Sequence, residues 1–304
     1  MGERASSSVE IAGVRLTSPD RLLYEEAGFT KRDLAAYYEA VAPRMLPHVA
    51  GRPLTLLRCP AGRGACFFQR HPGRAIPKAV RQVAIAEKDD PDAVSLVVED
   101  LSGLFALVQI GTLEIHPWGA RADDPDRPDR IVFDLDPDPG IGFAPVVAAA
   151  QELRAHLDAL GLASFAKTSG GKGLHVTVPI RRRYGWDEVK AFARALAGRM
   201  AEAAPDRYTT NPLKEARGGR IFIDYLRNDR GNTAVAPYSP RARAGAPVAT
   251  PLAWAEVTPA LDPAAFTIAT VPDRLAALQA DPWSEMAELQ QSLSARARRG
   301  VGLA

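Results

Sequence analysis

The stretch RIVFDLDPDPG, Arg130 to Gly140, combines a hydrophobic run typical of a β-strand with two aspartates spaced two residues apart. Side chains alternate between the faces of a strand, so Asp134 and Asp136 point to the same side. Two carboxylates that close together repel each other unless a cation lies between them. The alternative is an acidic turn, since Asp, Pro and Gly are common turn residues. Both aspartates precede the turn, however, and the pattern therefore favours a strand that presents paired acids to a cation.

The segments around this strand alternate between helical and extended patterns. Upstream, a helical period runs from Thr30 to about Ala42, with Thr30 as the N-cap of the helix. The strand candidates in this part are PLTLLRC, VSLVVED and TLEIHPWG, and a short apolar helix is predicted for LSGLFALVQIG. Downstream come an amphipathic helix from about Pro145 to Gly161, a strand–glycine loop–strand pattern in SFAKTSGGKGLHVTVPI, a second long helix in GWDEVKAFARALAGRMAEAAP and a strand in GRIFIDYLRN. This alternation predicts an α/β or α+β fold whose catalytic core runs from about Val94 to Ser239. The end of the chain, SLSARARRGVGLA, is predicted to be frayed and basic.

Length and composition indicate a globular protein. The chain has 304 residues, of which 46% are hydrophobic and 24% charged, enough to bury a core as one large domain or as two lobes. No apolar run is long enough to cross a bilayer, and the N-terminal MGERASSSVE lacks the apolar segment of a secretory signal. We therefore expect a soluble, cytoplasmic protein.

The two cysteines, Cys59 and Cys66, are too few for a disulfide framework. A zinc site that adds His71 lacks a fourth ligand, and its spacing matches no common zinc finger. Free thiols are therefore predicted.

Positive charge is local, because the net charge is only +2. It clusters in RGACFFQRHPGRAIPKAVR, from Arg63 to Arg81, and in IRRRYGW, KEARGGR and SPRARAG; each cluster alone is typical of a solvated surface. In the first cluster, adjacent Phe67 and Phe68 cannot both face the core of a regular strand. One ring could stack on a nucleic-acid base, and a loop anchored by one buried Phe is equally compatible with the pattern.

A third acid and a glycine loop suggest chemistry on phosphates. Asp224 lies in a later strand and could join Asp134 and Asp136 on a shared sheet, where three carboxylates suit a pair of hard divalent cations in phosphoryl transfer. In KTSGGKGLHV, glycines allow close approach of the backbone to phosphates, and three side chains can contact phosphate oxygens: Ser169, Lys172 and His175. The stretch lacks the Walker spacing and precedes a strand, so a plain hairpin is the alternative.

Two further polar residues have open roles. Arg227, three residues beyond Asp224, can pair with a phosphate or form a structural salt bridge. His116 closes a strand near the same core and can meet a ribose hydroxyl or be an ordinary strand-end histidine.

Taken together, FDLDPDPG, SGGKGLHV and RIFIDYLRN, in that order and separated by long helices, resemble the polymerase domain of bacterial ligase D. That domain belongs to the archaeo-eukaryotic primase superfamily and serves nonhomologous end joining. The resemblance runs from SPDRLLY to PYSPRARAGAPVATPLAW and implies a mixed α/β fold, with two β-sheets around a central cleft and one sheet of the RNA-recognition type. It implies a single primase-polymerase domain over residues 1–304, with an N-terminal part (1–93), a catalytic core (94–250) and C-terminal turns and tail (251–304).

The resemblance also assigns residues. The metal-binding acids of the family correspond to Asp134, Asp136 and Asp224. The residues that hold the incoming nucleotide correspond to His116 at the sugar and to Ser169, Lys172, His175, Arg227 and Arg241 at the phosphates. The DNA contacts correspond to Arg21 and Lys31 at a 5′-phosphate, Phe67 and Phe68 on the template, and Lys214 and Arg217 in an end-aligning loop. The family often has lysine where this chain has Arg21.

The implied reaction is nucleotidyl transfer. Two divalent cations, manganese preferred and magnesium possible, would stabilise charge while a primer 3′-hydroxyl attacks the α-phosphate of a ribo- or deoxyribonucleoside triphosphate. The implied partners are DNA with gaps or broken ends, Ku and a separate ligase, without a membrane, in a nucleoid-associated cytoplasmic protein. The chain has no room for ligase or nuclease domains, which implies a stand-alone paralogue or an excised domain.

Two other functions compete with this interpretation. A phosphatase of the haloacid dehalogenase type also ends a strand with D-x-D, but there a small or hydroxyl residue usually follows, where this chain has Pro137. A noncatalytic DNA-end-binding module would use the basic clusters and would not need three acids. Both alternatives predict no nucleotide-dependent primer extension.

Overall fold

The computed structural model describes residues 8–73 and 76–304. The chain forms two compact units, and it passes between them repeatedly. Unit 1 comprises Met1–Pro117, Val235–Val248 and Ala265–Gln279, and unit 2 comprises Trp118–Ala234, Ala249–Ala264 and Ala280–Ala304. These boundaries differ from the expected divisions after residues 93 and 250, and the single-domain organisation stays a prediction. Most of the N-terminal stretch MGERASSSVE and residues 74–75 of the first basic cluster lie outside the described residues.

Unit 1 contains a five-stranded sheet in which four strands follow the order β6-β5-β8-β7 and β9 pairs with β5 along its whole length. Its strands are β5 (Leu54–Arg58), β6 (Phe67–Gln69), β7 (Arg81–Ala84), β8 (Val94–Val97) and β9 (Thr112–Pro117). Two small hairpins join β1 (Ser8–Ile11) to β2 (Val14–Thr17) and β3 (Leu22–Tyr24) to β4 (Phe29–Thr30). The helices are α1 (Lys31–Val49), α2 (Leu101–Gln109) and α5 (Val271–Ala277).

The helix α1 begins where the sequence predicts. The Thr30 hydroxyl accepts a hydrogen bond from the Asp33 N–H, and the Asp33 carboxylate accepts one from the Thr30 N–H, which forms a capping box. The helix continues beyond Ala42 to Val49 although it contains two prolines. Buried Met45 and Val49 continue the apolar face, so packing against the core of unit 1 outweighs the interruption of the helix by proline.

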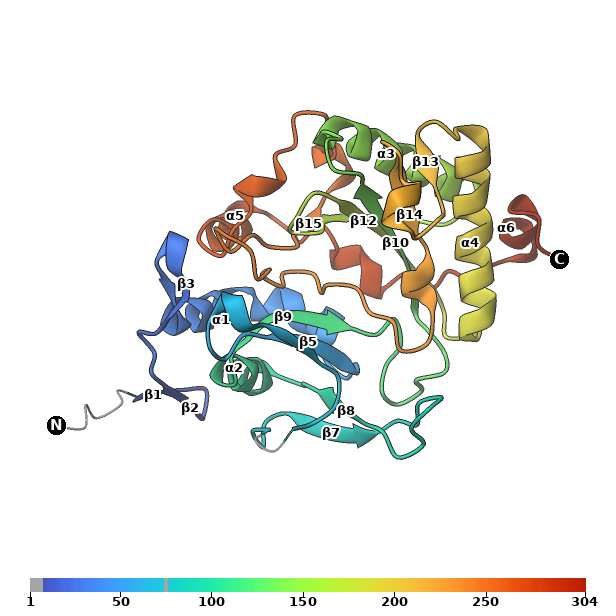
Figure 1. Ribbon diagram of the computed structural model, residues 1–304. Coiled ribbons are helices and arrows are strands. Elements are labelled where there is room, and N and C mark those ends of the chain that lie inside the picture. Colours follow the sequence, from blue (N-terminus) through green and yellow to red (C-terminus); the bar gives the residue numbers. More distant parts are fainter. Residues whose placement is uncertain (1–7, 74–75) are drawn as a thin grey trace. The chain divides into compact units, whose positions relative to one another are not determined.

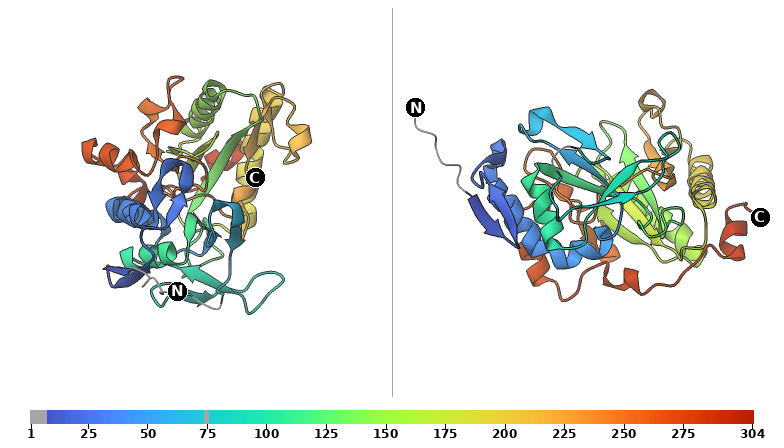
Figure 2. Two further views of the ribbon diagram at one scale, coloured as in Figure 1. Left: turned by 60° about the vertical axis from the view of Figure 1, so that its left-hand side comes forward. Right: turned by 90° about the horizontal axis from the view of Figure 1, so that it is seen from below.

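Unit 2 contains a six-stranded sheet with the order β13-β14-β10-β12-β11-β15, antiparallel except between β13 and β14. Its strands are β10 (Arg130–Pro137), β11 (Phe165–Thr168), β12 (Leu174–Pro179), β13 (Tyr208–Thr209), β14 (Ile221–Asp224) and β15 (Pro251–Leu252). The helices are α3 (Phe143–Ala159), α4 (Trp186–Ala203) and α6 (Ala295–Gly300). The long helices α3 and α4 pack against this sheet and both contact β10 (Figures 1 and 2).

The central strand β10 separates an apolar face from an acidic face. Ile131, Phe133 and Leu135 are fully buried on one side. Asp134 and Asp136 lie on the other side, within the strand as predicted. Burial of the apolar residues fixes the register of the strand, because a slip of one residue would turn both acids into the core.

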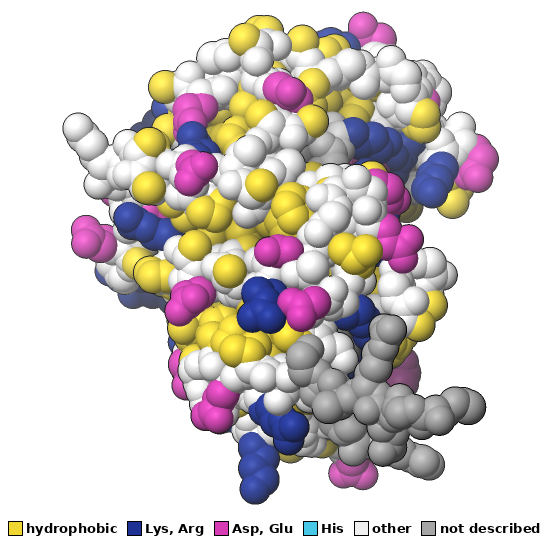
Figure 3. Space-filling model, turned by 90° about the vertical axis from the view of Figure 1, so that its left-hand side faces the viewer, with side chains coloured by type: hydrophobic (Ala, Val, Ile, Leu, Met, Phe, Trp, Pro, Cys, Tyr) yellow, Lys and Arg dark blue, Asp and Glu magenta, His cyan; other side chains and the backbone are white. Residues whose placement is uncertain are grey.

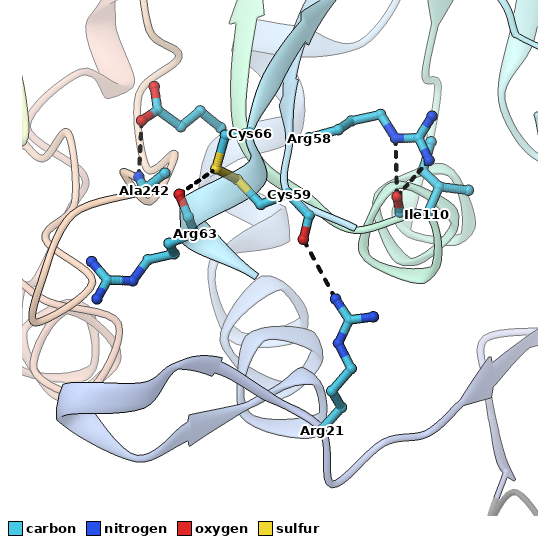
Figure 4. Close-up of a disulfide and its surroundings, with 8 residues drawn as sticks. Arg21, Arg58, Cys59, Arg63, Cys66, Ile110 and Ala242 are labelled. Atoms are coloured by element: carbon cyan, nitrogen blue, oxygen red, sulfur yellow. Dashed lines mark hydrogen bonds between the residues drawn. A yellow bond between two sulfur atoms is a disulfide. The ribbon is translucent and has the colours of Figure 1, made fainter. Parts of the chain in front are cut away.

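The prediction of free thiols is wrong, because Cys59 and Cys66 form a disulfide (Figure 4). Strands β5 and β6 pair as an antiparallel hairpin in which Arg58 lies opposite Phe67. The next position on each strand is a cysteine, and the two Cα atoms are 4.2 Å apart, within reach of a disulfide. The sequence separation of seven residues gives no such indication unless the hairpin register is known.

The prediction of a frayed C-terminus is also wrong. Ser294 caps α6 by accepting a hydrogen bond from the Ala297 N–H at 3.1 Å, and Arg199 of α4 donates to the Gly300 carbonyl. Ala297 and Val301 are buried. A short capped helix therefore packs where charge alone predicted a loose tail.

Two observations concern membrane-spanning helices and surface charge. In the part of the chain that the structure describes, no helix has the length and hydropathy needed to span a membrane. On the face shown in Figure 3, basic and acidic side chains are interspersed in small groups, as expected from a net charge of +2.

Candidate active site

Four polar side chains form a row across the acidic face of the unit 2 sheet. Asp224 of β14 lies opposite Asp134 of β10, Asp134 lies opposite His175 of β12, and His175 lies opposite Lys167 of β11. Directly opposed residues of antiparallel strands point to the same face. The expectation that Asp224 shares a sheet with Asp134 and Asp136 is therefore confirmed.

Asp134 is surrounded by positive charge and hydrogen-bond donors. Its carboxylate contacts Arg227 Nη2 at 3.2 Å and His175 Nε2 at 3.4 Å. Burial acts to raise the pKa of Asp134, but His175, Arg227 and Lys167 outweigh it and hold the pKa well below its usual range. Asp134 is therefore a permanent carboxylate at neutral pH.

Asp224 has the opposite electrostatic balance. Arg227 Nε lies 3.0 Å from its Oδ2, and the Leu226 N–H donates to its Oδ1 at 2.8 Å. Burial raises its pKa to about 6, the charges of Asp134 and Asp136 add to the rise, and Arg227 offsets it only in part. The negative charge of Asp224 is therefore the one that the site compensates least.

Asp136 is held by two cations of its own. Arg217 Nη1 lies 2.7 Å from Oδ2 and Lys172 Nζ lies 3.3 Å from Oδ1. Arg217 is only 7% exposed and its guanidinium stacks on Phe222, the residue opposite Asp136. Its side chain thus lies with the acids, whereas Lys214 in the same loop is exposed.

His175 is neutral at physiological pH. Burial and the neighbouring Lys167 lower its pKa to about 4, against the opposing effect of Asp134. Its Nε2 faces Asp134, and its buried Nδ1 has no hydrogen-bond partner among the described residues. The ring can therefore donate from Nε2 toward the acidic face without carrying a charge.

The glycine loop between β11 and β12 is folded tightly against β10. The Ser169 N–H donates to the Gly173 carbonyl at 3.0 Å, and the Ser169 hydroxyl accepts from the Gly173 N–H at 3.2 Å. A Cβ on Gly173 would lie 2.5 Å from the Leu135 carbonyl oxygen, so only glycine fits there. Lys172 of this loop donates to the Pro137 carbonyl and contacts Asp136. The loop is a hairpin, as the alternative interpretation allowed, and it still brings Lys172 to Asp136.

The three aspartates suit a hard divalent cation in their chemistry, because carboxylate oxygens are the preferred ligands of such ions. The buried, under-compensated charge of Asp224 beside Asp134 is the kind of arrangement that a cation would relieve. Within residues 8–73 and 76–304, no three His, Cys, Asp or Glu side chains are grouped closely enough to hold a metal. Arginine and lysine groups instead contact the carboxylate oxygens that a metal would use.

His116 and Arg241 belong to unit 1 and share one partner. Glu114, on the same face of β9 as His116, accepts from His116 Nε2 at 2.8 Å and from Arg241 Nε at 2.9 Å. Burial acts to raise the pKa of Glu114, but His116, Arg241 and the Ala242 N–H lower it to about 2. The ionised carboxylate therefore binds the two predicted nucleotide contacts together.

Phe67 and Phe68 are both exposed at the surface of β6, at 46% and 64%. The interpretation of a loop anchored by one buried Phe is therefore wrong. The Arg58 guanidinium lies over the Phe67 ring at 5.5 Å, and the rings of Phe68 and His116 meet edge to face with their centroids 5.8 Å apart. Two exposed rings beside an arginine and a histidine are typical of a surface that stacks nucleic-acid bases.

Arg21 and Lys31 lie near each other beside the first strands. Lys31 Nζ donates to the Thr17 carbonyl and to both the carbonyl and the side-chain oxygen of Gln109, at 2.7 to 3.1 Å. Burial and the neighbouring Arg21 lower the pKa of Lys31 to about 8. Arg21 is exposed and donates to the Cys59 carbonyl at 3.4 Å, as Figure 4 shows.

Sequence reasoning missed three residues: Glu114 in unit 1, and Lys167 and Asn228 in unit 2. Glu114 precedes His116 by two residues in a strand, the same spacing that drew attention to Asp134 and Asp136. The Asn228 amide accepts from the Val132 N–H at 2.7 Å and donates to its carbonyl at 2.8 Å, and so continues the ladder of β10 beyond the end of β14. Only a known sheet register could have revealed the roles of Asn228 and Lys167.

Comparison with known proteins identifies the fold and the family of this chain. A solved polymerase domain from Mycobacterium tuberculosis ligase D in complex with DNA superposes with a TM-score of 0.84 at 31% identity, covering 91% of this chain and 99% of that one. The mixed α/β fold is thus that of a primase-polymerase domain, as predicted. A family model described as LigD, primase-polymerase domain, matches residues 30–283. The chain therefore belongs to the LigD primase-polymerase family.

Relatives of known description agree with this assignment. The multifunctional non-homologous end joining protein LigD of Pseudomonas aeruginosa is 39% identical over 300 residues, which are 98% of this chain and 36% of that protein. The bifunctional non-homologous end joining protein LigD of Bacillus subtilis is 35% identical over 265 residues, 86% of this chain and 42% of that protein. The chain spans less than half the length of these relatives.

Proposed function

We propose that this chain is a metal-dependent, DNA-directed nucleotidyltransferase that adds ribo- or deoxyribonucleotides at gaps and break ends during nonhomologous end joining. The observation that carries the proposal is that Asp134, Asp136 and Asp224 lie on one face of paired strands, in a member of the LigD primase-polymerase family. The described partner of the related M. tuberculosis domain, DNA, supports a nucleic-acid substrate.

The acids would hold two divalent cations, with manganese preferred over magnesium. Such ions, when bound, neutralise charge on the attacking and leaving oxygens of phosphoryl transfer. Asp134 is ready for this role because its carboxylate is ionised over the whole physiological range. Asp224, with a pKa near 6, is ionised above that pH, which predicts that activity rises between pH 5 and pH 7.

The triphosphate would be held by the groups that now balance the acids. Arg227 and Lys172 are 40% and 46% exposed, so each can reach a phosphate oxygen from its present position beside a carboxylate. Ser169 and the neutral His175 add hydroxyl and imidazole donors. The sequence left two roles open for Arg227, a structural ion pair and a phosphate contact. In this proposal Arg227 has both roles.

Unit 1 would bind the sugar and the DNA. His116 and Arg241 contact the nucleotide, Phe67 and Phe68 stack on the template, and Arg21 with Lys31 binds the 5′-phosphate of a gap. Lys214 and Arg217 of unit 2 would assist in aligning the DNA ends. The expected partners are Ku and a separate ligase. The expected location is cytoplasmic and nucleoid-associated.

The proposal is tested by extension of a labelled primer across a short gap with a downstream 5′-phosphate, with manganese and either ribo- or deoxyribonucleotides. We expect extension by the wild type, faster with ribonucleotides, and none by Asp134→Ala. The matched control is Asp123→Ala, which removes an exposed carboxylate that pairs with Arg182 and should leave extension unchanged. DNA binding without extension by the wild type would favour the noncatalytic module instead.

A further inference from the structure

Glu114 is the centre of a buried network in unit 1. Its side chain is 5% exposed, and Oε2 accepts hydrogen bonds from His116 Nε2 at 2.8 Å and from Arg241 Nε at 2.9 Å. The other oxygen, Oε1, accepts from the Ala242 N–H at 2.8 Å. One carboxylate therefore joins His116 of the same strand to Arg241, which lies 127 residues beyond Glu114 in the chain.

The carboxylate cannot turn without breaking these contacts. Strand β9 fixes its Cα, the Ala242 N–H fixes Oε1, and the two charged or polar side chains fix Oε2. The segment that carries Arg241 is itself attached to β9, because the Ile115 N–H donates to the Ser239 hydroxyl at 2.9 Å and the Ala236 N–H donates to the Ile115 carbonyl at 2.8 Å. The network is thus rigid on both sides of Glu114.

We propose that Glu114 is a positioning residue for nucleotide selection: it orients the His116 imidazole and the Arg241 guanidinium so that sugar and phosphate are bound in one register. The inference rests on the proposed function, in which both residues contact the nucleotide. Because the Glu114 carboxylate can only accept a hydrogen bond, the ring proton of His116 lies on Nε2. This hydrogen bond also fixes the plane of the ring, as carboxylates do for metal-binding histidines. The Phe68 ring meets the same ring edge to face, so His116 has a neighbour on a second side.

The variant Glu114→Gln tests this role with little change in volume. Glutamine offers one acceptor oxygen and one donor group, so it cannot accept from Ala242 on one side and from both His116 and Arg241 on the other. We expect the KM for a ribonucleotide to rise about tenfold, the cost typical of losing a group that orients a binding residue. We expect kcat to change much less, because the carboxylates of β10 and β14 are untouched. The preference for ribo- over deoxyribonucleotides should fall toward that of His116→Ala.

A matched control is Glu99→Gln, which removes the same charge from the partly exposed ion pair with Arg81 in the same unit. Its kinetic constants should equal those of the wild type. A variant that melts at a lower temperature but keeps wild-type KM and ribose preference would show that Glu114 supports only the fold, and would overturn the proposal.

A double-mutant cycle separates positioning from an independent effect. If Glu114 acts on the sugar through His116, Glu114→Gln should not change the ribose preference further once His116 is Ala. Additive losses in the double variant would contradict the proposal, because they require Glu114 to act without His116.

A spectroscopic measurement keeps the inference separate from polymerase activity. The chain has only five histidines, so the imidazole nitrogens of His116 can be assigned by their loss in His116→Ala. In the nucleotide-free protein at pH 7 we expect a protected proton on His116 Nε2 that is lost in Glu114→Gln. A wild type that fails to extend primers but shows this proton would refute the proposed function and leave the fixed ring established. An unchanged His116 signal in Glu114→Gln would overturn the positioning role whatever the activity.

Discussion

Asp224 lies directly opposite Asp134 on the adjacent strand, and Arg227 contacts the carboxylates of both. The pKa of Asp134 is held below its usual range while that of Asp224 is raised to about 6. Neighbouring acids whose pKa values are moved apart by their surroundings are typical of functional sites. The ionised Asp224 carboxylate therefore lowers the stability of the folded protein, while it adds a third carboxylate to the face that carries the other two.

Asp224→Asn should stabilise the metal-free protein at pH 8 while abolishing extension. Because the folded pKa lies above the unfolded value of 3.8, the protonated acid contributes stability that is fully present below about pH 4 and is lost as pH rises through 6. The gain from Asn over Asp should therefore be larger at pH 8 than at pH 5, by about 1 kcal/mol. Denaturant unfolding in chelator at both pH values measures it, and an equal gain at both would contradict the assigned pKa.

Gly173→Ala should destabilise the protein and remove activity. Its Cβ would meet the Leu135 carbonyl oxygen at 2.5 Å, next to Asp134 and Asp136, at a cost of about 1–3 kcal/mol. The control is Gly198→Ala in the interior of α4, where a Cβ meets no atom within 4 Å and should stabilise by about 0.5–1 kcal/mol. Opposite shifts in melting temperature are expected, and a neutral Gly173→Ala would show that the loop can move away from β10.

Phe68→Ala should weaken template binding without affecting stability. An exposed ring that stacks on a base contributes about 1–3 kcal/mol, so affinity for a primer with a single-stranded template should fall at least about fivefold. The melting temperature should stay unchanged. Phe67→Ala provides a comparison, since Phe67 is already covered in part by Arg58. Equal affinity of wild type and Phe68→Ala would remove the stacking assignment.

The preference for a 5′-phosphorylated gap should decline between pH 7 and pH 9. Burial lowers the pKa of Lys31 to about 8, so its ammonium group loses its charge within this range and attracts a phosphate less. Lys31→Met should show little preference at either pH, which makes it the control for other titrating groups. Binding of gapped DNA with and without the 5′-phosphate measures the effect, and a preference of the wild type that does not change with pH would refute the role of Lys31.

The sequence could predict those features that depend on local spacing. Alternation in a strand places Asp134 and Asp136 on one face, and the capping residues locate the start of α1. The helix–strand order predicts the fold class. These features follow from periodicity within a single element.

Features that depend on pairing between distant segments could not be predicted. The disulfide requires the register of the β5–β6 hairpin, and the burial of Lys31 against Gln109 requires the packing of α2 beside α1. The shared role of Glu114 joins β9 to a segment 127 residues away. Sequence shows the residue types in each case, whereas tertiary structure decides which of them meet.

The most direct test of the account is the initial rate of single-ribonucleotide addition to a gapped primer as manganese is titrated into metal-free protein, for the wild type and Asp136→Asn. Asp136 is chosen because its side chain is 32% exposed, and the amide oxygen of an asparagine can still accept a hydrogen bond from buried Arg217. We predict no addition in chelator, a rate that rises and saturates with manganese for the wild type, and a rate at least about a hundredfold lower for Asp136→Asn. Addition by the wild type in chelator, or undiminished addition by Asp136→Asn, would contradict the assignment of catalysis to these carboxylates.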